Sequence, residues 1–151
     1  MHRFLPLSVL GVLVAAAMTA GITDDGADGL PELSDAQIRA AREQGVIIQV
    51  DDDRGPVDEA LAARLLAAAN VRGDPKLHEV LAVSRGAFRY ARGEDAASSD
   101  DAWLVAISNV ETICFGGDLC PDPPDLDTEV VALTAGALEP IGDYWVFADS
   151  E

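Results

Sequence analysis

The sequence predicts an α+β domain in which N-terminal helices pack on a four-stranded antiparallel sheet. Two observations support this fold class. Between residues 34 and 72, apolar side chains recur at helical spacing and capping residues mark the helix ends. From residue 77 onward, runs rich in valine, isoleucine and aromatic residues alternate with segments that contain glycine, proline and aspartate, which is typical of strands joined by turns.

Two helices are expected in the first half of the chain. The first is predicted at Asp35–Gln44, because Ser34 and Gln37 have the spacing of a capping box and Gly45 can adopt the left-handed conformation that ends a helix. The second is predicted to open at Pro56, a residue tolerated in a first turn, and to end near residues 70–72. Its apolar stripe consists of Val57, Ala60, Leu61, Leu65 and Ala68.

The strands are expected later in the chain. The segment 46–50 is short and β-branched, and we expect it to be extended. A bulge or bend is expected at Gly86, where the large side chains change phase. Because 102–110 is almost continuously apolar, this strand should be buried on much of both faces. The four predicted strands are 77–84 with its continuation 87–92, then 102–110, 128–134 and 143–148, with a polar loop at 93–101 and a turn at 135–137.

The N-terminus has the pattern of a secretory signal peptide at residues 1–20. A short cationic start is followed by an uncharged stretch, Phe4–Ala20, that ends in small residues such as Ala15 and Ala17. Cleavage is expected near residues 17–21, so that the protein is secreted or extracytoplasmic. An uncleaved leader that anchors the chain in a membrane is the alternative.

Length and charge limit the remaining possibilities. Residues 21–33 are predicted to be a flexible acidic tail, and 34–151 is long enough for a single domain with one core. The formal net charge is −17. Such a charge repels nucleic acid and anionic membranes, and it favours solubility, cations and basic partners.

The two cysteines are expected to form a disulfide, as is usual in an exported chain. Cys114 and Cys120 enclose a short flexible loop within the long proline-containing connection 111–127. Phe115 and Leu119 are either presented to a protein partner or packed beneath the loop. The candidate contact residues are Phe115, Gly116, Gly117 and Leu119.

No catalytic, metal-binding or cofactor-binding residues are predicted. His78 is the single histidine after the leader, and no nucleophile motif accompanies it. Neither Asp51–Asp53 nor the acids of 118–127 follow the order of an EF-hand loop, although calcium binding by these loops is left open.

Three segments together resemble the PepSY domains. Residues 56–63 resemble the opening helix, 102–107 the central strand and 130–138 the closing hairpin of that family. The resemblance spans residues 56–139, which also look like part of small exported bacterial proteins. It implies a cystatin-like α+β fold and a regulatory or inhibitory role toward peptidases outside the membrane, without catalytic residues.

The leading functional hypothesis is therefore an exported, non-enzymatic binding or regulatory domain. Its partner would be a protein, with an extracellular peptidase as the candidate. Two alternatives stay open: a small secreted hydrolase that uses carboxylates, and a structural envelope protein anchored in the membrane by its uncleaved leader.

Overall fold

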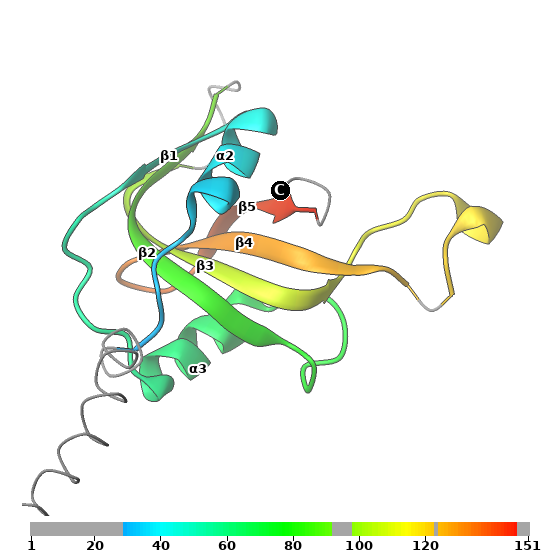
Figure 1. Ribbon diagram of the computed structural model, residues 1–151, viewed down its shortest axis with the longest axis horizontal. Coiled ribbons are helices and arrows are strands. Elements are labelled where there is room, and N and C mark those ends of the chain that lie inside the picture. Colours follow the sequence, from blue (N-terminus) through cyan, green and yellow to red (C-terminus); the bar gives the residue numbers. More distant parts are fainter. Residues whose placement is uncertain (1–28, 92–97, 123, 148–151) are drawn as a thin grey trace, which may run out of the picture.

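The computed structural model describes residues 29–91, 98–122 and 124–147. These residues form one five-stranded antiparallel sheet with the strand order β1-β2-β3-β4-β5, and helices α2 and α3 pack against it (Figure 1). The leader, the first part of the predicted tail and most of the predicted 93–101 loop lie outside the described residues. The elements are α2 (Asp35–Glu43), β1 (Val46–Val50), α3 (Glu59–Ala69), β2 (Glu79–Tyr90), β3 (Ser99–Glu111), a 3₁₀ turn η1 (Gly117–Leu119), β4 (Leu126–Thr134) and β5 (Pro140–Val146).

The predicted fold class is wrong. The domain is mostly β, a curled half-barrel of five strands with two short helices, and not a four-stranded sheet packed against N-terminal helices. The additional strand is β1, the segment 46–50 that was expected only to be extended. Val46–Val50 pairs along its whole length with Gly86–Tyr90 of β2. The cystatin-like arrangement implied by the resemblance fails for the same reason.

The expected fold has its helices on one face of the sheet, whereas α2 and α3 lie on opposite faces (Figure 1). Successive residues of β3 point to opposite faces of the sheet, where they join two separate hydrophobic cores, one next to α2 and one next to α3. Leu104 packs in the α2 core, whereas Trp103 and Val105 pack in the α3 core. The central strand is therefore buried on both faces, as its continuous apolar sequence indicated.

The curl of the sheet brings its last strand, β5, toward its second strand, β2. The backbone amide of Asp143 on β5 donates to the Tyr90 hydroxyl on β2 at 3.3 Å. Helix α2 spans the remaining gap: the Gln44 side chain accepts a hydrogen bond from the Trp145 amide at 3.0 Å and donates to the Trp145 carbonyl. Gln44 thus pairs with the exposed edge of β5 much as another strand would.

The capping box of α2 is confirmed. Ser34 Oγ accepts from the amide of Gln37 at 3.1 Å, and Gln37 Oε1 accepts from the amide of Ser34 at 2.8 Å. Gly45 follows the helix with φ of +79°. Because both ends of this helix depend on local side chains and a glycine, its position could be deduced from sequence.

Helix α3 begins three residues later than predicted, at Glu59. Asp58 is its N-cap and accepts a hydrogen bond from the Leu61 amide at 2.8 Å, while Val57 forms an isolated parallel bridge with Gly29. A contact distant in sequence thus keeps Val57 extended. The helix ends at Asn70, whose φ is +48°.

Residues 29–33, assigned to the tail in the sequence analysis, contact the sheet. The Val83 amide donates to the Pro31 carbonyl at 2.9 Å, and the Leu33 amide donates to the hydroxyl of buried Ser84 at 3.0 Å. The Arg54 guanidinium donates to the carbonyls of Leu30 and Val83. This short segment therefore lies along the outer edge of β2.

The predicted irregularity at Gly86 is confirmed. The register between β2 and β3 shifts between Gly86 and Phe88, and again between Val80 and Ala82. A side chain at Gly86 would also meet the carbonyl oxygen of Gln49, 2.0 Å from an ideal Cβ. Glycine at this position lets β1 approach β2 closely.

Candidate functional site

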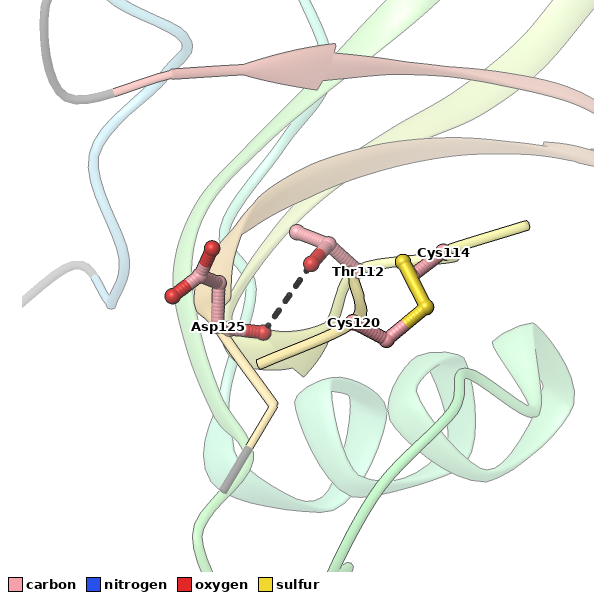
Figure 2. Close-up of a disulfide and its surroundings, with 4 residues drawn as sticks. All are labelled: Thr112, Cys114, Cys120 and Asp125. Atoms are coloured by element: carbon pink, nitrogen blue, oxygen red, sulfur yellow. Dashed lines mark hydrogen bonds between the residues drawn. A yellow bond between two sulfur atoms is a disulfide. The ribbon is translucent and has the colours of Figure 1, made fainter. Parts of the chain in front are cut away.

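A long loop joins β3 to β4 and is closed at its base by backbone pairing. Glu111 pairs with Leu126, and just beyond them the Thr112 amide and hydroxyl both donate to the Asp125 carbonyl, at 3.0 and 3.2 Å. Figure 2 shows the hydroxyl bond next to the disulfide. The loop extends from the end of the sheet, away from both helices (Figure 1). Residues 112–125 are called the disulfide loop below.

The predicted disulfide is confirmed. Cys114 and Cys120 are bonded, with their Cα atoms 5.7 Å apart (Figure 2). Between them the backbone forms the turn η1, in which the Leu119 amide donates to the Gly116 carbonyl at 3.1 Å. Gly117 has φ of +59°, a value that glycine adopts without strain. The two glycines therefore let this short segment turn back on itself so that the sulfurs meet.

The tip of the disulfide loop presents two large apolar side chains to solvent. Phe115 is 93% exposed and Leu119 is 89% exposed, the highest values among the exposed large hydrophobic residues of the described chain. The alternative that these side chains pack beneath the loop is therefore wrong. Ile113, closer to the sheet, is half exposed. The loop tip is therefore apolar, exposed and closed by a covalent bond.

Acidic residues surround this apolar tip. The segment 111–127 contains no lysine or arginine. A partner that approaches the tip therefore meets a negative potential, which adds to the negative charge of the whole chain. The acids of this segment are Glu111, Asp118, Asp122, Asp125 and Asp127.

A pair of carboxyl groups that the sequence analysis missed lies in a second place, on the α3 face. Glu129 of β4 hydrogen-bonds to Asp143 of β5, next to a small cavity of about 200 Å³ that Arg72 and Trp145 also line. Burial is the main cause that raises the pKa of Glu129 to about 8. The hydrogen bond and charge of Asp143 act in the same direction, and the charge of Arg72 opposes them.

The sequence did contain a signal for this pair. Glu129, Val131 and Leu133 are every second residue of β4 and so share one face of the strand. Val131 and Leu133 are both buried in the α3 core. An acid on an otherwise apolar strand face is unusual, because burial of a charge is costly. Its partner could not be deduced, since Asp143 becomes its neighbour only through the pairing of β4 with β5.

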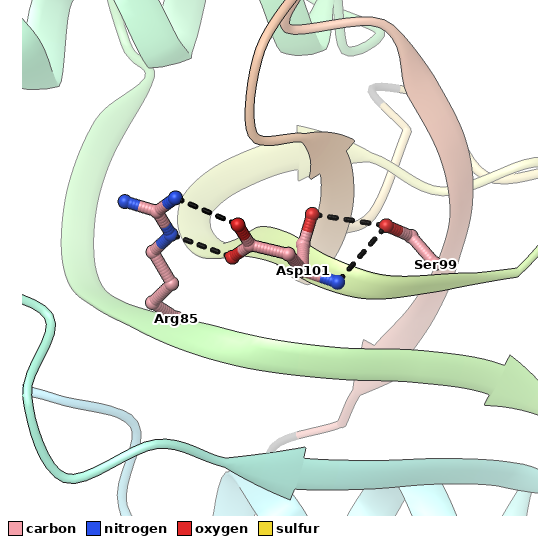
Figure 3. A network of polar contacts seen from close by, with 3 residues as sticks. All are labelled: Arg85, Ser99 and Asp101. Carbon is pink, nitrogen blue, oxygen red and sulfur yellow. Dashed lines mark hydrogen bonds and ion pairs between the residues drawn. The ribbon is translucent and has the colours of Figure 1, made fainter.

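A third polar cluster lies across β2 and β3 of the sheet. Arg85 Nε and Nη2 donate to the two carboxylate oxygens of Asp101 at 2.7 and 2.8 Å (Figure 3). Ser99 holds the backbone of Asp101 through two hydrogen bonds, and the guanidinium lies 4.9 Å from the centre of the Trp103 ring. This two-pronged ion pair connects β2 with β3 and has the features of a structural contact.

The remaining candidates of the sequence analysis are dispersed. His78 lies just before β2, and its Nε2 is 2.9 Å from the Arg72 carbonyl, so it supports a turn. Asp51–Asp53 are exposed side by side in a loop. Within the described ranges, no group of three or more His, Cys, Asp or Glu side chains is placed to hold a metal ion.

Two findings concern the compartment. A disulfide is characteristic of proteins in oxidising, extracytoplasmic environments. In the part of the chain that the structure describes, neither helix has the length and apolar character needed to cross a bilayer.

Comparisons with known proteins found no matching family model, and neither a curated protein nor a solved structure matches this chain.

Proposed function

We propose that this chain is an exported, non-enzymatic binding domain whose contact surface is the tip of the disulfide loop. The observation that supports this function most strongly is the exposure of Phe115 and Leu119 on a covalently closed loop. Two large apolar side chains at the end of a projecting segment gain nothing from folding. They gain stabilisation when a partner covers them, at about 25 cal/mol per Å² of apolar area removed from water.

The disulfide supports the same proposal through pre-organisation. A flexible loop loses conformational entropy when it binds, and this cost reduces affinity. The Cys114–Cys120 bond and the hydrogen bond from Thr112 to the Asp125 carbonyl already order the loop in the folded chain, so less entropy is lost on binding. Phe115 and Leu119 would then act as anchors in a pocket of the partner.

The charge of the loop specifies the chemistry of the partner. An apolar pocket bordered by lysine or arginine matches an apolar tip surrounded by acids. The resemblance to PepSY domains makes an extracellular peptidase the candidate partner class. No catalytic role is required of this chain.

Export is the second part of the proposal. The leader at residues 1–20 directs the chain out of the cytoplasm and is removed near residues 17–21, after which the disulfide forms. Intact mass of the protein recovered outside the cytoplasm tests this step. A mass that corresponds to the complete 151 residues would instead favour the membrane-anchored alternative.

The contact surface is tested by affinity capture from culture medium. The wild-type chain is compared with Phe115→Ala/Leu119→Ala and with a control, Ile47→Ala/Leu77→Ala, whose side chains are about half exposed on other elements. We expect wild type and control to retain the same partner and the loop variant to lose it. Equal recovery by all three chains would refute the proposal.

Glu129 supports a second candidate function, a hydrolase that uses carboxylates. An acid with a pKa of about 8 is protonated at neutral pH and can donate a proton, and the Asp143 carboxyl lies next to it. The adjacent cavity of about 200 Å³ is, however, smaller than the roughly 300–1,000 Å³ of typical ligand sites. Hydrolysis of ester or glycoside substrates that Glu129→Gln abolishes would establish this function and displace the first.

A further inference from the structure

An apolar groove lies between the N-terminal half of α3 and the segment that enters the domain at Gly29. Its volume is about 790 Å³, and it shares no lining residue with the disulfide loop. Its apolar walls are formed by Leu30, Pro56, Val57, Ala62, Leu66 and Val80. The small side chains of Ala62 and Ala63 leave room for another backbone to approach the helix.

The walls of the groove are fixed by hydrogen bonds outside it. Arg54 donates to the Leu30 carbonyl, and the parallel bridge between Gly29 and Val57 joins the two sides. Val57, one of the lining residues, is almost entirely shielded from solvent. The groove is therefore present before any ligand arrives, as is common for binding sites.

The negative charge at the rim of the groove favours a ligand that carries positive charge. Asp58 and Glu59 are both exposed at its rim, and no lysine or arginine is among its described lining residues. The Asp58 carboxylate already accepts the amide hydrogen bond at the start of α3, so the positive end of the helix is neutralised. An anionic ligand would meet two carboxylates and, among the described lining residues, no cationic side chain.

The edge of β2 beside the groove indicates a peptide. β1 pairs with β2 only from Gly86 to Tyr90, and the segment 29–33 hydrogen-bonds to the backbone of β2 at Val83, so the outer edge of β2 at Glu79–Ala82 pairs with no strand among the described residues. Val80, which lines the groove, lies on this edge. An extended peptide can pair with such an edge and place alternate side chains in the adjacent groove.

We propose that this groove binds an extended apolar peptide segment flanked by basic residues, contributed by a partner protein. The rim acids pair with the basic residues, and the apolar side chains occupy the groove. A second copy of this chain is a poor occupant, because copies that each carry a net charge of −17 repel one another. The site is separate from the disulfide loop and does not depend on its proposed function.

The groove is tested with the exported chain, from which the leader has been removed, and two fluorescent synthetic peptides. One is Lys-Lys-Leu-Ala-Leu-Ala-Leu-Lys-Lys, and the other has glutamate in place of every lysine. We expect fluorescence anisotropy to detect binding of the basic peptide alone. The affinity should fall as salt is raised, because the ionic part of the interaction is screened.

Two matched pairs of variants locate the binding. Ala63→Arg places a long cation in the groove, whereas Ala67→Arg makes the same change one turn along α3, where the exposed side chain does not line the groove. We expect Ala63→Arg to weaken binding about tenfold or more and Ala67→Arg to leave it near the wild-type value. Glu59→Gln should weaken binding a few-fold and Glu43→Gln, on α2, should not.

Four results would overturn the proposal. These are the absence of binding by the basic peptide, equal binding of the acidic peptide, equal effects of the two arginine variants, and self-association of the chain that Ala63→Arg removes. The last would assign the groove to a second copy. Since Phe115→Ala/Leu119→Ala leaves the groove intact, its peptide binding should equal that of wild type whatever the fate of the loop proposal.

Discussion

Gly142 of β5 lies against the ring of Phe88 of β2, three places away in the strand order. An ideal Cβ at position 142 would be 2.5 Å from Phe88 Cε1 and 2.7 Å from the hydroxyl oxygen of Tyr90. Phe88 is fully buried. The sheet therefore curls until its last strand closes over the side chains of its second, and the absence of a side chain at Gly142 permits this approach.

Gly142→Ala is expected to destabilise the fold by about 1–3 kcal/mol, as overpacking of a filled core does. Gly136→Ala is the control, because a Cβ there meets nothing within 4 Å and the residue has no positive φ. Urea denaturation measures both. Equal midpoints for the two variants would show that β5 does not press on Phe88.

Gln44→Ala should lower the free energy of unfolding by about 1–2 kcal/mol, because two hydrogen bonds to the Trp145 backbone are lost. Gln49→Ala is the control, since Gln49 is an exposed glutamine of β1. Amide hydrogen exchange should also accelerate at Trp145 in the Gln44 variant. Unchanged exchange there would mean that α2 does not hold the edge of β5.

Substitution by phenylalanine is expected to change the melting temperature in opposite directions at two tyrosines on the α2 side of the sheet. The hydroxyl of buried Tyr144 has no hydrogen-bond partner among the described residues, and burial raises the pKa of this phenol. Tyr144→Phe should therefore raise the melting temperature. Tyr90→Phe should lower it, since the Tyr90 hydroxyl accepts from the Asp143 amide. A fall in the melting temperature of Tyr144→Phe would contradict this account.

Glu129 is expected to make stability decrease as pH rises. The fold raises the pKa of Glu129 from 4.5 to about 8, so the folded chain holds this proton more tightly than the unfolded chain. The stabilisation is complete below about pH 4.5 and is lost as pH rises through about 8. Glu129→Gln should therefore be more stable than wild type at pH 8.5 and nearly equal to it at pH 4.5.

Urea denaturation at the two pH values measures this difference, and Glu79→Gln, at an exposed acid of β2, is the control. Solvent reaches the half-buried Glu129, which reduces the size of the effect below that of a fully buried acid. A wild-type to Glu129→Gln difference that is the same at both pH values would show that folding does not raise the pKa of Glu129.

The features that could be predicted from sequence are those that local residues determine. Ser34 and Gln37 cap α2 across three residues, and Cys114 and Cys120 close a loop of only a few. Gly86 marks a bulge because it interrupts the alternation of large side chains in its own strand. Each of these depends on neighbours in sequence, so the pattern is visible without the fold.

The features that could not be predicted depend on distant pairing. Val46–Val50 becomes a strand of the sheet through partners some forty residues away, and Val57 stays out of α3 through Gly29. The sequence of β3 is apolar on both faces and lacks an alternation of polar and apolar residues. It therefore gives no sign that the helices lie on opposite sides of the sheet. In the candidate site, the disulfide was visible in the sequence, whereas the exposure of Phe115 depends on where the loop leaves the sheet.

The central claim is that a covalently closed, apolar loop tip binds a protein partner, and the affinity of the captured partner tests it most directly. Calorimetry would compare the oxidised chain, the chain reduced at Cys114–Cys120 and Phe115→Ala/Leu119→Ala. All three should stay folded at the temperature of the measurement, because the tip contributes little to the core. We expect tight binding to the first, weaker binding to the second and none to the third. Equal affinity for all three, with folding intact, would contradict the account.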